Sequence, residues 1–560
     1  MSKKSPHPKK SIPQPNERYT LKNTLANAYL FVMFTLFPLF INLTVEKSFP
    51  FITFANGYRA IRHQKYYFFM IITAAALIVQ IMLLLTKTAA ERKAANPEKR
   101  RLTNLLSFTD WAVLAFVLSC AVSTVFSPYL EMALTGESAF GGRNNGLLLM
   151  LTYAAIYFML TRCYRYREYV FLAMAIVNGL ICLLAVLNGF YHDPLGMLEP
   201  FRTSTMEADI RVYENFMTTI GNKNMFSSHL CVTLPVLITL FVHTKKWWCK
   251  AVYLASAAVG AMAVIVCDSD SVVLGLGAFV AVYLVVYVRR LDRLRQFLLA
   301  LTVMLLNVKL LRWFSYLGGD RYKDLTALPC KLMFSNKTFL LIGALAVLTA
   351  ALYAVSLRFP KRVLPKAVPV VLASLMGAAV LAGVGVIVYF TAIDTKTDLG
   401  SWERLLRYGD AWGTHRGFMW NRSLEAFKDY NFFQKLFGTG PETFYYTFSP
   451  YFGELYERFG DGSTDAAHNE YINYLMNIGI VGLLSYLAFT GSALVRGFRA
   501  AKHNPIALVF ASAVVAYMAQ AVVNISVPIA TPLCIIFVSL CEATARQASK
   551  MPAPPVGKPV

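Results

Sequence analysis

The chain has 560 residues, of which 56% are hydrophobic and only 15% charged, and its 54 Lys and Arg outweigh 31 Asp and Glu to give a net charge of +23. Soluble domains are about 25% charged, so this composition excludes an ordinary soluble enzyme, and the apolar fraction excludes a disordered chain. Binding to nucleic acid would explain the charge but not the long uncharged runs, so no nucleic acid is expected as a partner. Such a basic excess is typical of the cytoplasmic loops of a polytopic membrane protein.

Apolar runs long enough to cross a membrane recur along the whole chain, which predicts an all-α, polytopic integral membrane bundle of about 12–14 transmembrane helices. The fourth run is short, and the last two form a tight hairpin around Asn524 and Pro528. The fourteen candidate spans are residues 24–45, 66–86, 107–127, 146–161, 169–190, 223–243, 250–267, 271–288, 296–313, 338–357, 367–392, 467–494, 506–524 and 525–543.

Basic clusters lie on alternate loops between these spans. They occur at the N-terminus and near residues 87–101, 162–167, 245–250, 289–295, 358–366 and 496–502. All of them can be cytoplasmic at once, which places both termini in the cytoplasm. The loop before the second span is the weakest fit, because it carries Arg59, Arg62 and Lys65 on the opposite face.

The opposite face receives the longer and more acidic loops, 191–222 and 393–466. The second is about seventy residues long and contains eleven acids and eight Lys or Arg. A connector needs far fewer residues, and long ordered loops are usually functional. We therefore expect 393–466 to be a large extracytoplasmic loop with a functional role.

Ionisable residues are scarce inside the spans, with Asp110, His229 and Lys309 as the main exceptions. Transporters driven by ions or protons usually need such groups near the midplane, so their scarcity argues against a transporter. Asp110 fits an interfacial position, His229 a satisfied core histidine, and Lys309 a side chain that snorkels to the membrane surface.

The sequence offers little support for a metal site. None of the nine cysteines forms a CxxC pair, and most lie in apolar runs, so neither a disulfide framework nor a zinc site is expected. Asp268 and Asp270 resemble the two-carboxylate metal sites of some membrane glycosyltransferases, but a pair with this spacing can equally cap the following helix. The cap is the preferred interpretation, and no metal or other cofactor is predicted.

Two polar motifs stand at span ends on the extracytoplasmic side. In FGGRNNG (140–146), Arg143 could hold phosphate oxygens between glycines that permit close approach, or could simply anchor the span at the interface. In GNKNMF (221–226), Asn222 and Asn224 can cap the sixth span, and a helix start with free N–H groups is also an anion site.

The long loop carries the strongest pattern. After Arg416, an amphipathic stretch places apolar residues at near-helical spacing, followed by the turn GTGPETF (438–444). His468 then precedes Gly479 by eleven residues, almost three helical turns, which predicts that both share one face of the twelfth span. Gly479 and Gly482 would let a neighbouring helix pack closely.

These residues together resemble the O-antigen ligase and O-antigen polymerase family of bacterial membrane glycosyltransferases, over roughly residues 105–545. Arg143, Gly146 and Asn224 match weaker upstream patterns, and Ser269-Asp270 departs from the Ser-Arg of many members. The most specific part is the order Arg416, Trp420, Gly438, Gly440, Pro441, Phe444, His468, Asn469, Gly479 and Gly482.

The resemblance implies transfer or polymerisation of an undecaprenyl-diphosphate-linked glycan onto an acceptor hydroxyl of a glycan, lipid or protein, outside the cytoplasmic face and without a metal. Arg416 would stabilise the diphosphate leaving group, and His468 would act as the base on the acceptor. Arg143, Asn222, Asn224, Asn469 and Trp420 are the predicted substrate-binding residues. The alternatives are a lipid-linked oligosaccharide flippase or transporter, and a metal-dependent glycosyltransferase that uses Asp268 and Asp270.

The predicted domain organisation follows from the same comparison. Three spans follow the large loop, as in the family, so the first two spans are an N-terminal addition. The predicted regions are a basic cytoplasmic tail (1–23), the two-helix addition (24–104), the ligase-like membrane domain (105–545) and a disordered cytoplasmic tail (546–560).

Overall fold

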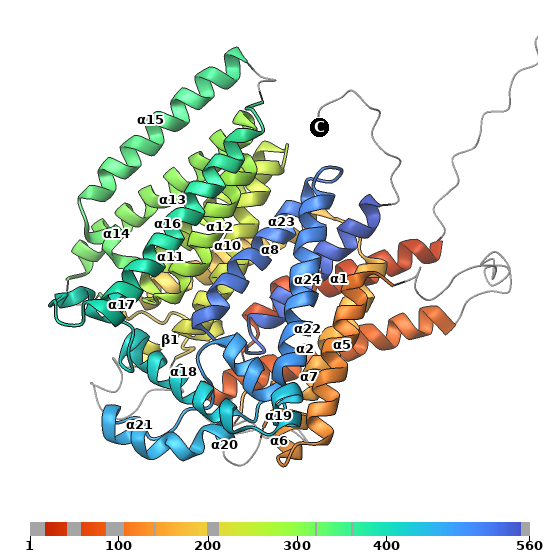
Figure 1. The fold of residues 1–560 in the computed structure, drawn as a ribbon. Helices are drawn as coiled ribbons and strands as arrows, with labels where there is room; N and C mark the ends of the chain where they lie inside the picture. The colour runs from red at the N-terminus through yellow and green to blue at the C-terminus, as the bar shows by residue number, and fades with distance from the viewer. Residues whose placement is uncertain are drawn as a thin grey trace, which may run out of the picture.

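The structure is a computed structural model, and it describes residues 17–41, 58–85, 106–137, 142–198, 212–319, 322–359 and 363–549. Long helices run side by side in one bundle, and a group of short helices gathers at one end of it (Figure 1). Residues 1–16 and 550–560 of the two predicted tails, the basic loop near 87–101 and part of loop 191–222 lie outside the described residues.

Each of the fourteen predicted spans coincides with a helix, which confirms the all-α polytopic fold. Ten described helices are long and apolar enough to cross a membrane, and α7 and α12 are shorter apolar helices. The fourteen are α1 (Glu17–Leu39), α2 (Tyr58–Leu85), α5 (Phe108–Val125), α7 (Leu147–Cys163), α8 (Glu168–Asn188), α10 (Lys223–His243), α11 (Trp247–Val266), α12 (Ser271–Tyr287), α13 (Leu291–Gly318), α15 (Lys337–Arg358), α16 (Ala367–Val388), α22 (Glu470–Ala500), α23 (Ile506–Gln520) and α24 (Thr531–Ala548).

Shorter elements connect these helices. A two-residue antiparallel ladder pairs β1 (Phe216–Met217) with β2 (Gly221–Asn222) just before α10. The short helices are α6 (Leu130–Thr135), α14 (Cys330–Phe334), α17 (Glu403–Leu406), α18 (Trp412–Asp429), α19 (Phe432–Phe437), α20 (Phe444–Phe448) and α21 (Phe452–Phe459).

Burial separates the centre of the bundle from its lipid-facing rim. Every side chain of α10 from Met225 to Val242 is buried, and α10 packs against α11, α12 and α23. By contrast, α16 has no buried side chain, although its sequence is almost entirely apolar. A helix that is apolar all round and yet uncovered by protein is what a membrane span in contact with lipid requires.

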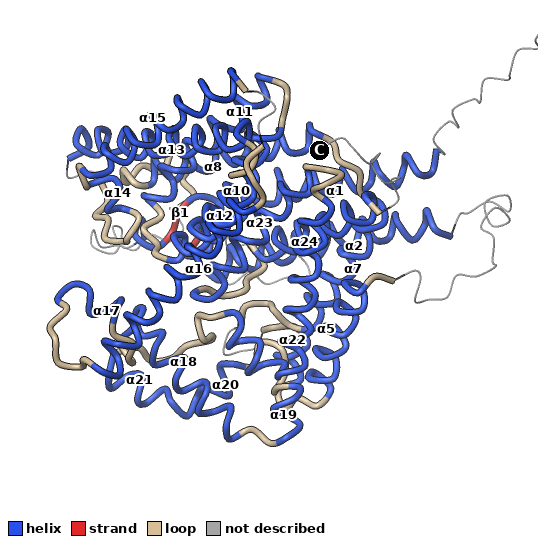
Figure 2. Tube along the Cα trace, turned by 45° about the horizontal axis from the view of Figure 1, so that its top comes forward, coloured by secondary structure: helices blue, strands red, loops and turns tan. Residues whose placement is uncertain are grey.

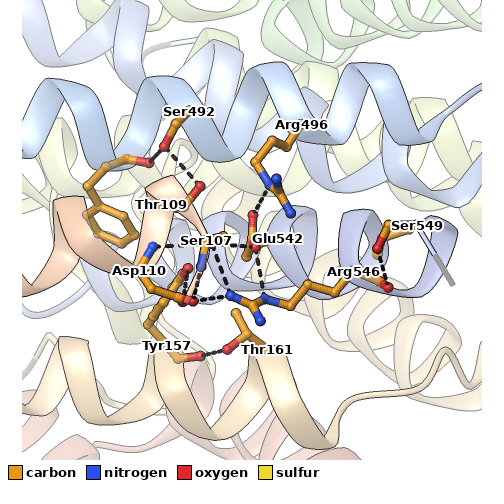
Figure 3. A network of polar contacts seen from close by, with 12 residues as sticks. Ser107, Thr109, Asp110, Tyr157, Thr161, Ser492, Arg496, Glu542, Arg546 and Ser549 are labelled. Atoms are coloured by element: carbon orange, nitrogen blue, oxygen red, sulfur yellow. Dashed lines mark hydrogen bonds and ion pairs between the residues drawn. The ribbon is translucent and has the colours of Figure 1, made fainter. Parts of the chain in front are cut away.

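One end of the bundle is held by a buried ion-pair network (Figure 3). The Asp110 carboxylate of α5 accepts hydrogen bonds from Tyr157 at 2.8 Å and from Arg162 at 3.1 Å, and it also pairs with Arg546. Glu542 of α24 likewise pairs with Arg546 at 2.8 Å. Asp110 is therefore more than the interfacial residue expected from the sequence, because it joins α5, α7 and α24. We call this the basic end, since the described parts of the basic loops lie here.

The opposite end carries a small helical subdomain formed by α18–α21, visible below the bundle in Figures 1 and 2. It has its own apolar core, in which Phe418, Phe444, Phe448 and Leu455 are buried. The amphipathic stretch predicted after Arg416 is thus helical. Its buried face includes Phe418 and Ala426, whereas the apolar residue Leu424 is exposed.

Two buried lysines and one histidine differ from their sequence interpretations. Lys65 donates to the carbonyls of Phe37 and Pro38 at 2.6 and 2.9 Å, so it caps the end of α1. Lys309 does not snorkel, because it donates to the carbonyls of Met333 and Ser335 at the end of α14, both at 2.8 Å. His229 is buried, and neither ring nitrogen has a hydrogen-bond partner among the described residues, so it is not a satisfied core histidine.

Candidate active site

Seven charged or titratable residues from six distant segments come together beside the α18–α21 subdomain. The imidazole of His468 lies within electrostatic range of Arg143, Arg416 and Asp465. Arg416 also interacts with Asp270, and Arg143 with Glu442. We refer to the group as the His468 cluster, which consists of Arg62, Arg143, Asp270, Arg416, Glu442, Asp465 and His468.

Arg416 is placed by an unusual turn at the start of α18. Gly413, Thr414 and His415 all have positive φ angles near 60°, so regular helix begins only at Arg416. Left-handed backbone at non-glycine residues is uncommon and tends to occur at functional sites. Nη1 of Arg416 donates to the Gly413 carbonyl, but its Nε is buried with no hydrogen-bond partner among the described residues. An unsatisfied guanidinium nitrogen here is available to a ligand.

His468 lies just outside the membrane-spanning helix that it was predicted to join. It has a φ of 50°, and α22 begins two residues later, at Glu470. The expected continuous helix from His468 to Gly479 is therefore wrong, because Gly479 also breaks the helix with φ 69° and ψ −172°. The side chain of His468 is half-buried, so it can be reached from solvent.

The surroundings of His468 favour its neutral form. Burial, together with the charges of Arg143 and Arg416, lowers the pKa of the imidazole well below its ordinary value of 6.5, although Asp465 opposes this effect. A neutral imidazole can accept a proton at physiological pH. Burial acts to raise the pKa of the Asp465 carboxyl, but Arg143 and Arg62 outweigh it and hold that pKa below its usual range.

Arg143 and Asp465 form an ion pair, in which the Arg143 side chain is only 6% exposed and that of Asp465 is 41% exposed. The pair joins the turn before α7 to the segment before α22. Since Asp465 already neutralises Arg143, a ligand phosphate would have to compete for that guanidinium. Arg416, with its unpaired Nε, is the stronger candidate for binding an anion.

Glu442 is a buried carboxyl that the sequence motifs did not single out. It has a φ of 64°, is 4% exposed, and its Oε1 has no hydrogen-bond partner among the described residues. It lines a cavity of about 20 Å³ together with Asn145, Glu470, Asn473 and Ser526. A polar cavity of this size holds about one water molecule. Burial raises the pKa of Glu442 to about 7, against the opposing charge of Arg143.

Arg62 brings the predicted N-terminal addition into the site. It lies on α2 and interacts electrostatically with both Asp465 and Glu442. The sequence contains one indication of this role. Arg62 stands in a basic loop on the extracytoplasmic side, where acidic loops are expected. Its position beside the carboxyls of Glu442 and Asp465 explains that mismatch. No feature of the sequence indicated that Asp465 would lie beside His468.

The other predicted substrate-binding residues have local structural contacts. The Asn222 side chain caps α10 by accepting from the Asn224 N–H at 2.8 Å, and the Asn469 side chain caps α22. Asn224 accepts from Ser269 at 2.9 Å, and Trp420 donates to the Ala467 carbonyl at 3.0 Å. Trp420 therefore ties α18 to the segment that carries His468. Contact of these four residues with substrate remains a prediction.

Asp268 and Asp270 both accept hydrogen bonds from the chain before α14. Oδ1 of Asp268 accepts from the N–H groups of Thr326 and Ala327 at 2.9 and 2.7 Å, and Oδ1 of Asp270 accepts from Leu328 at 2.6 Å. Neither side chain caps α12, so the prediction that this pair caps the following helix is wrong. These contacts give both carboxylates a structural use in holding the loop.

Glycines let two backbones cross beneath the site. A Cβ on Gly479 would overlap the Leu436 carbonyl of α19, and a Cβ on Gly438 would overlap the Asn477 carbonyl of α22. The Gly440 N–H also donates to the Asn477 carbonyl at 2.9 Å. Gly479 thus permits close packing as predicted, with α19 as its neighbour, whereas Gly482 packs on Ile478 of its own helix.

Comparison with known proteins identifies one similar family. Residues 334–487 match the family model described as O-antigen ligase, a segment that contains Arg416, Glu442, Asp465 and His468. No curated protein shows significant similarity to the chain. The family assembles surface polysaccharide by glycan transfer, and the match implies a glycosyltransferase-like enzyme. Residues 334–487 are therefore similar to the O-antigen ligase domain, in a chain whose described part holds ten helices long and apolar enough to cross a membrane.

Proposed function

We propose that the chain transfers or polymerises a glycan from undecaprenyl diphosphate onto an acceptor hydroxyl at the membrane face where α18–α21 lie. The observation that carries the proposal is the His468 cluster, in which Arg143 and Arg416 act on the His468 imidazole and favour its neutral form. A diphosphate leaving group develops negative charge as its bond to the sugar breaks, and guanidinium groups stabilise that charge. No nucleotide sugar and no metal ion is required.

The proposed step assigns one task to each group. The acceptor oxygen attacks the anomeric carbon with inversion, its proton passes to His468, and the bond from that carbon to the diphosphate oxygen breaks. Asp465 stabilises the imidazolium that results, because its carboxylate lies beside His468. Arg416 binds the departing diphosphate through its available Nε, and Arg143 and Arg62 add positive charge to the same cluster.

Two features favour transfer over transport. Within the spans, the buried carboxylates Asp110 and Glu542 are paired with arginines at the basic end, far from a midplane relay. The charged and titratable groups of the His468 cluster are instead gathered at the opposite end of the bundle. We therefore assign the cluster to chemistry on a lipid-linked substrate.

The test is transfer by purified protein from a defined undecaprenyl-diphosphate oligosaccharide, followed on a gel. Arg416→Ala should lower transfer by roughly 10–100-fold, as expected for one charged hydrogen bond of about 1.5–3 kcal/mol. Arg416→Lys should recover little, because a point charge cannot replace the planar fork. Arg458→Ala is the matched control, since Arg458 lies in the same subdomain and is 46% exposed.

Wild-type activity of Arg416→Lys would refute diphosphate binding by a guanidinium fork. A ladder of repeats would identify a polymerase, and a single adduct a ligase. Full activity in chelator would remove the alternative in which Asp268 and Asp270 hold a metal ion, whereas loss of activity that is restored by added metal would support it.

A further inference from the structure

A second polar site lies at the basic end, on the far side of the bundle from the His468 cluster. A cavity of about 520 Å³ opens between the ends of α10, α12 and α13 and the turn that joins α22 to α23. Its lining combines cationic groups with an apolar wall. The cationic or titratable groups are His243, Arg290, Arg293, Lys502 and His503, and the wall includes Val286, Tyr287 and Leu508.

The charges in this cavity are poorly neutralised. Arg290 and Arg293 share a single acid, Asp292, at 3.2 and 3.5 Å. Lys502 and His503 are exposed, and no acidic side chain pairs with either of them within the described part of the chain. Arg293 is also held by the Val242 carbonyl at 3.1 Å, so it forms a fixed back wall, while Arg290 is 42% exposed.

The depth of the cavity matches the boundary between headgroups and acyl chains. The cations lie at the ends of the helices, whereas Val286 and Leu508 lie within the last turn of α12 and the first turn of α23. Pro505, which lines the cavity, immediately precedes α23, so the positive end of that helix dipole lies beside this space. Basic pockets between transmembrane helices are suited to the phosphate of an anionic lipid, with apolar surface below for its chains.

We propose that this cavity is a binding site for the headgroup of an anionic phospholipid. The phosphate would lie between Arg290 and Lys502, and the glycerol and first acyl carbons would lie against Val286 and Leu508. Such a lipid would join the α22–α23 turn to α13. The site does not depend on the proposed glycan transfer.

Native mass spectrometry of the purified full-length protein tests this site. Dioleoyl phosphatidylglycerol should be retained in preference to dioleoyl phosphatidylcholine, which has the same chains but no net charge. The double substitution Arg290→Glu/Lys502→Glu should weaken retention at least about tenfold, because two basic contacts to an anionic lipid are lost and reversed. Lys396→Glu/Lys428→Glu is the matched control, since both lysines are exposed at the other end of the bundle.

Unfolding temperature serves as the check on folding. If the charge-reversed protein is destabilised, Arg290→Gln/Lys502→Gln replaces it, and a smaller loss of phosphatidylglycerol is expected. Equal retention of the two lipids, or unchanged retention in both charge variants, would overturn the proposal. Displacement of phosphatidylglycerol by millimolar inorganic phosphate would show a phosphate site that makes no use of the lipid chains, and it would equally overturn the lipid assignment.

Discussion

His468 combines two properties that a base for glycan transfer needs. It is half-buried at the end of α22, and its pKa is held below 6.5 by burial and by two arginines. The sequence predicted the second property in direction, because basic residues precede His468 in the loop. The left-handed backbone that takes His468 out of the helix was not predicted, although histidine is one of the non-glycine residues in which this conformation is more frequent.

Glu442 should make donor binding depend on pH near neutrality. Its pKa of about 7 means that it ionises as the pH rises from 6 to 8, next to the arginines proposed to bind a diphosphate. An ionised carboxylate repels that anion, so the KM for the donor should rise by up to about tenfold across this interval. In Glu442→Gln the KM should be constant, because the amide keeps the shape but does not titrate. A pH-dependent KM in that variant would contradict the assignment.

The acid limit of turnover should then report His468. A base must be neutral, and a lowered pKa keeps the imidazole neutral as the pH falls through 6.5. In the Glu442→Gln background, kcat should therefore stay constant from pH 8 to below 6.5 and fall only at lower pH. An inflection at 6.5 would mean that His468 is not in the environment described here.

At the scale of elements, two glycine contacts set the position of the site. The turn after α19 crosses the break in α22, and both backbones come so close that only glycine fits at positions 438 and 479. The sequence indicated close packing at Gly479 but not its partner, because periodicity identifies a face of a helix and not what lies against it. The break in α22 was not predicted, because a single glycine such as Gly479 is also tolerated inside a continuous helix.

Gly479→Ala should be strongly destabilising. The new Cβ would overlap the Leu436 carbonyl, and alanine would have to adopt a φ of 69°. Together these effects should cost about 2–4 kcal/mol. Gly491→Ala in the same helix is the control, since its Cβ would meet nothing within 4 Å. Thermal unfolding in detergent should separate the two variants, and equal unfolding temperatures would show that the backbones do not cross at Gly479.

The first two helices are more than an appendage to the bundle. Phe34 of α1 stacks on Phe537 of α24 at 5.3 Å, and α2 places Arg62 beside Asp465 and Glu442. The sequence located both helices from hydropathy alone. Their place in the bundle could not be predicted, because lipid-facing and protein-facing sides of an apolar helix have similar composition.

For the whole molecule, the arrangement of helix ends fits the orientation expected from charge. The described basic loops share one end of the bundle, and α18–α21 lie at the other (Figure 1). Hydropathy and the alternation of basic loops were sufficient to predict that these two groups of loops lie at opposite ends of the bundle. The convergence of six segments on His468 depends on tertiary packing, which neither pattern encodes.

Orientation can be measured by thiol labelling. Ser449 is exposed in the α18–α21 subdomain, and all nine native cysteines are buried. With Cys330 removed as a further precaution, Ser449→Cys should react with an impermeant thiol reagent in intact cells. Labelling that requires lysis would place the subdomain in the cytoplasm and would reverse the proposed topology.

The most direct measurement of the central claim is single-turnover transfer by His468→Asn, with donor binding measured separately on the same sample. Asparagine retains a hydrogen-bonding side chain but cannot take the proton of the acceptor. The account predicts normal insertion, donor affinity within about twofold of wild type, and transfer at least about a hundredfold slower, the low end for loss of a general base. Transfer at a near-normal rate by His468→Asn would contradict it and leave the proposed reaction without its base.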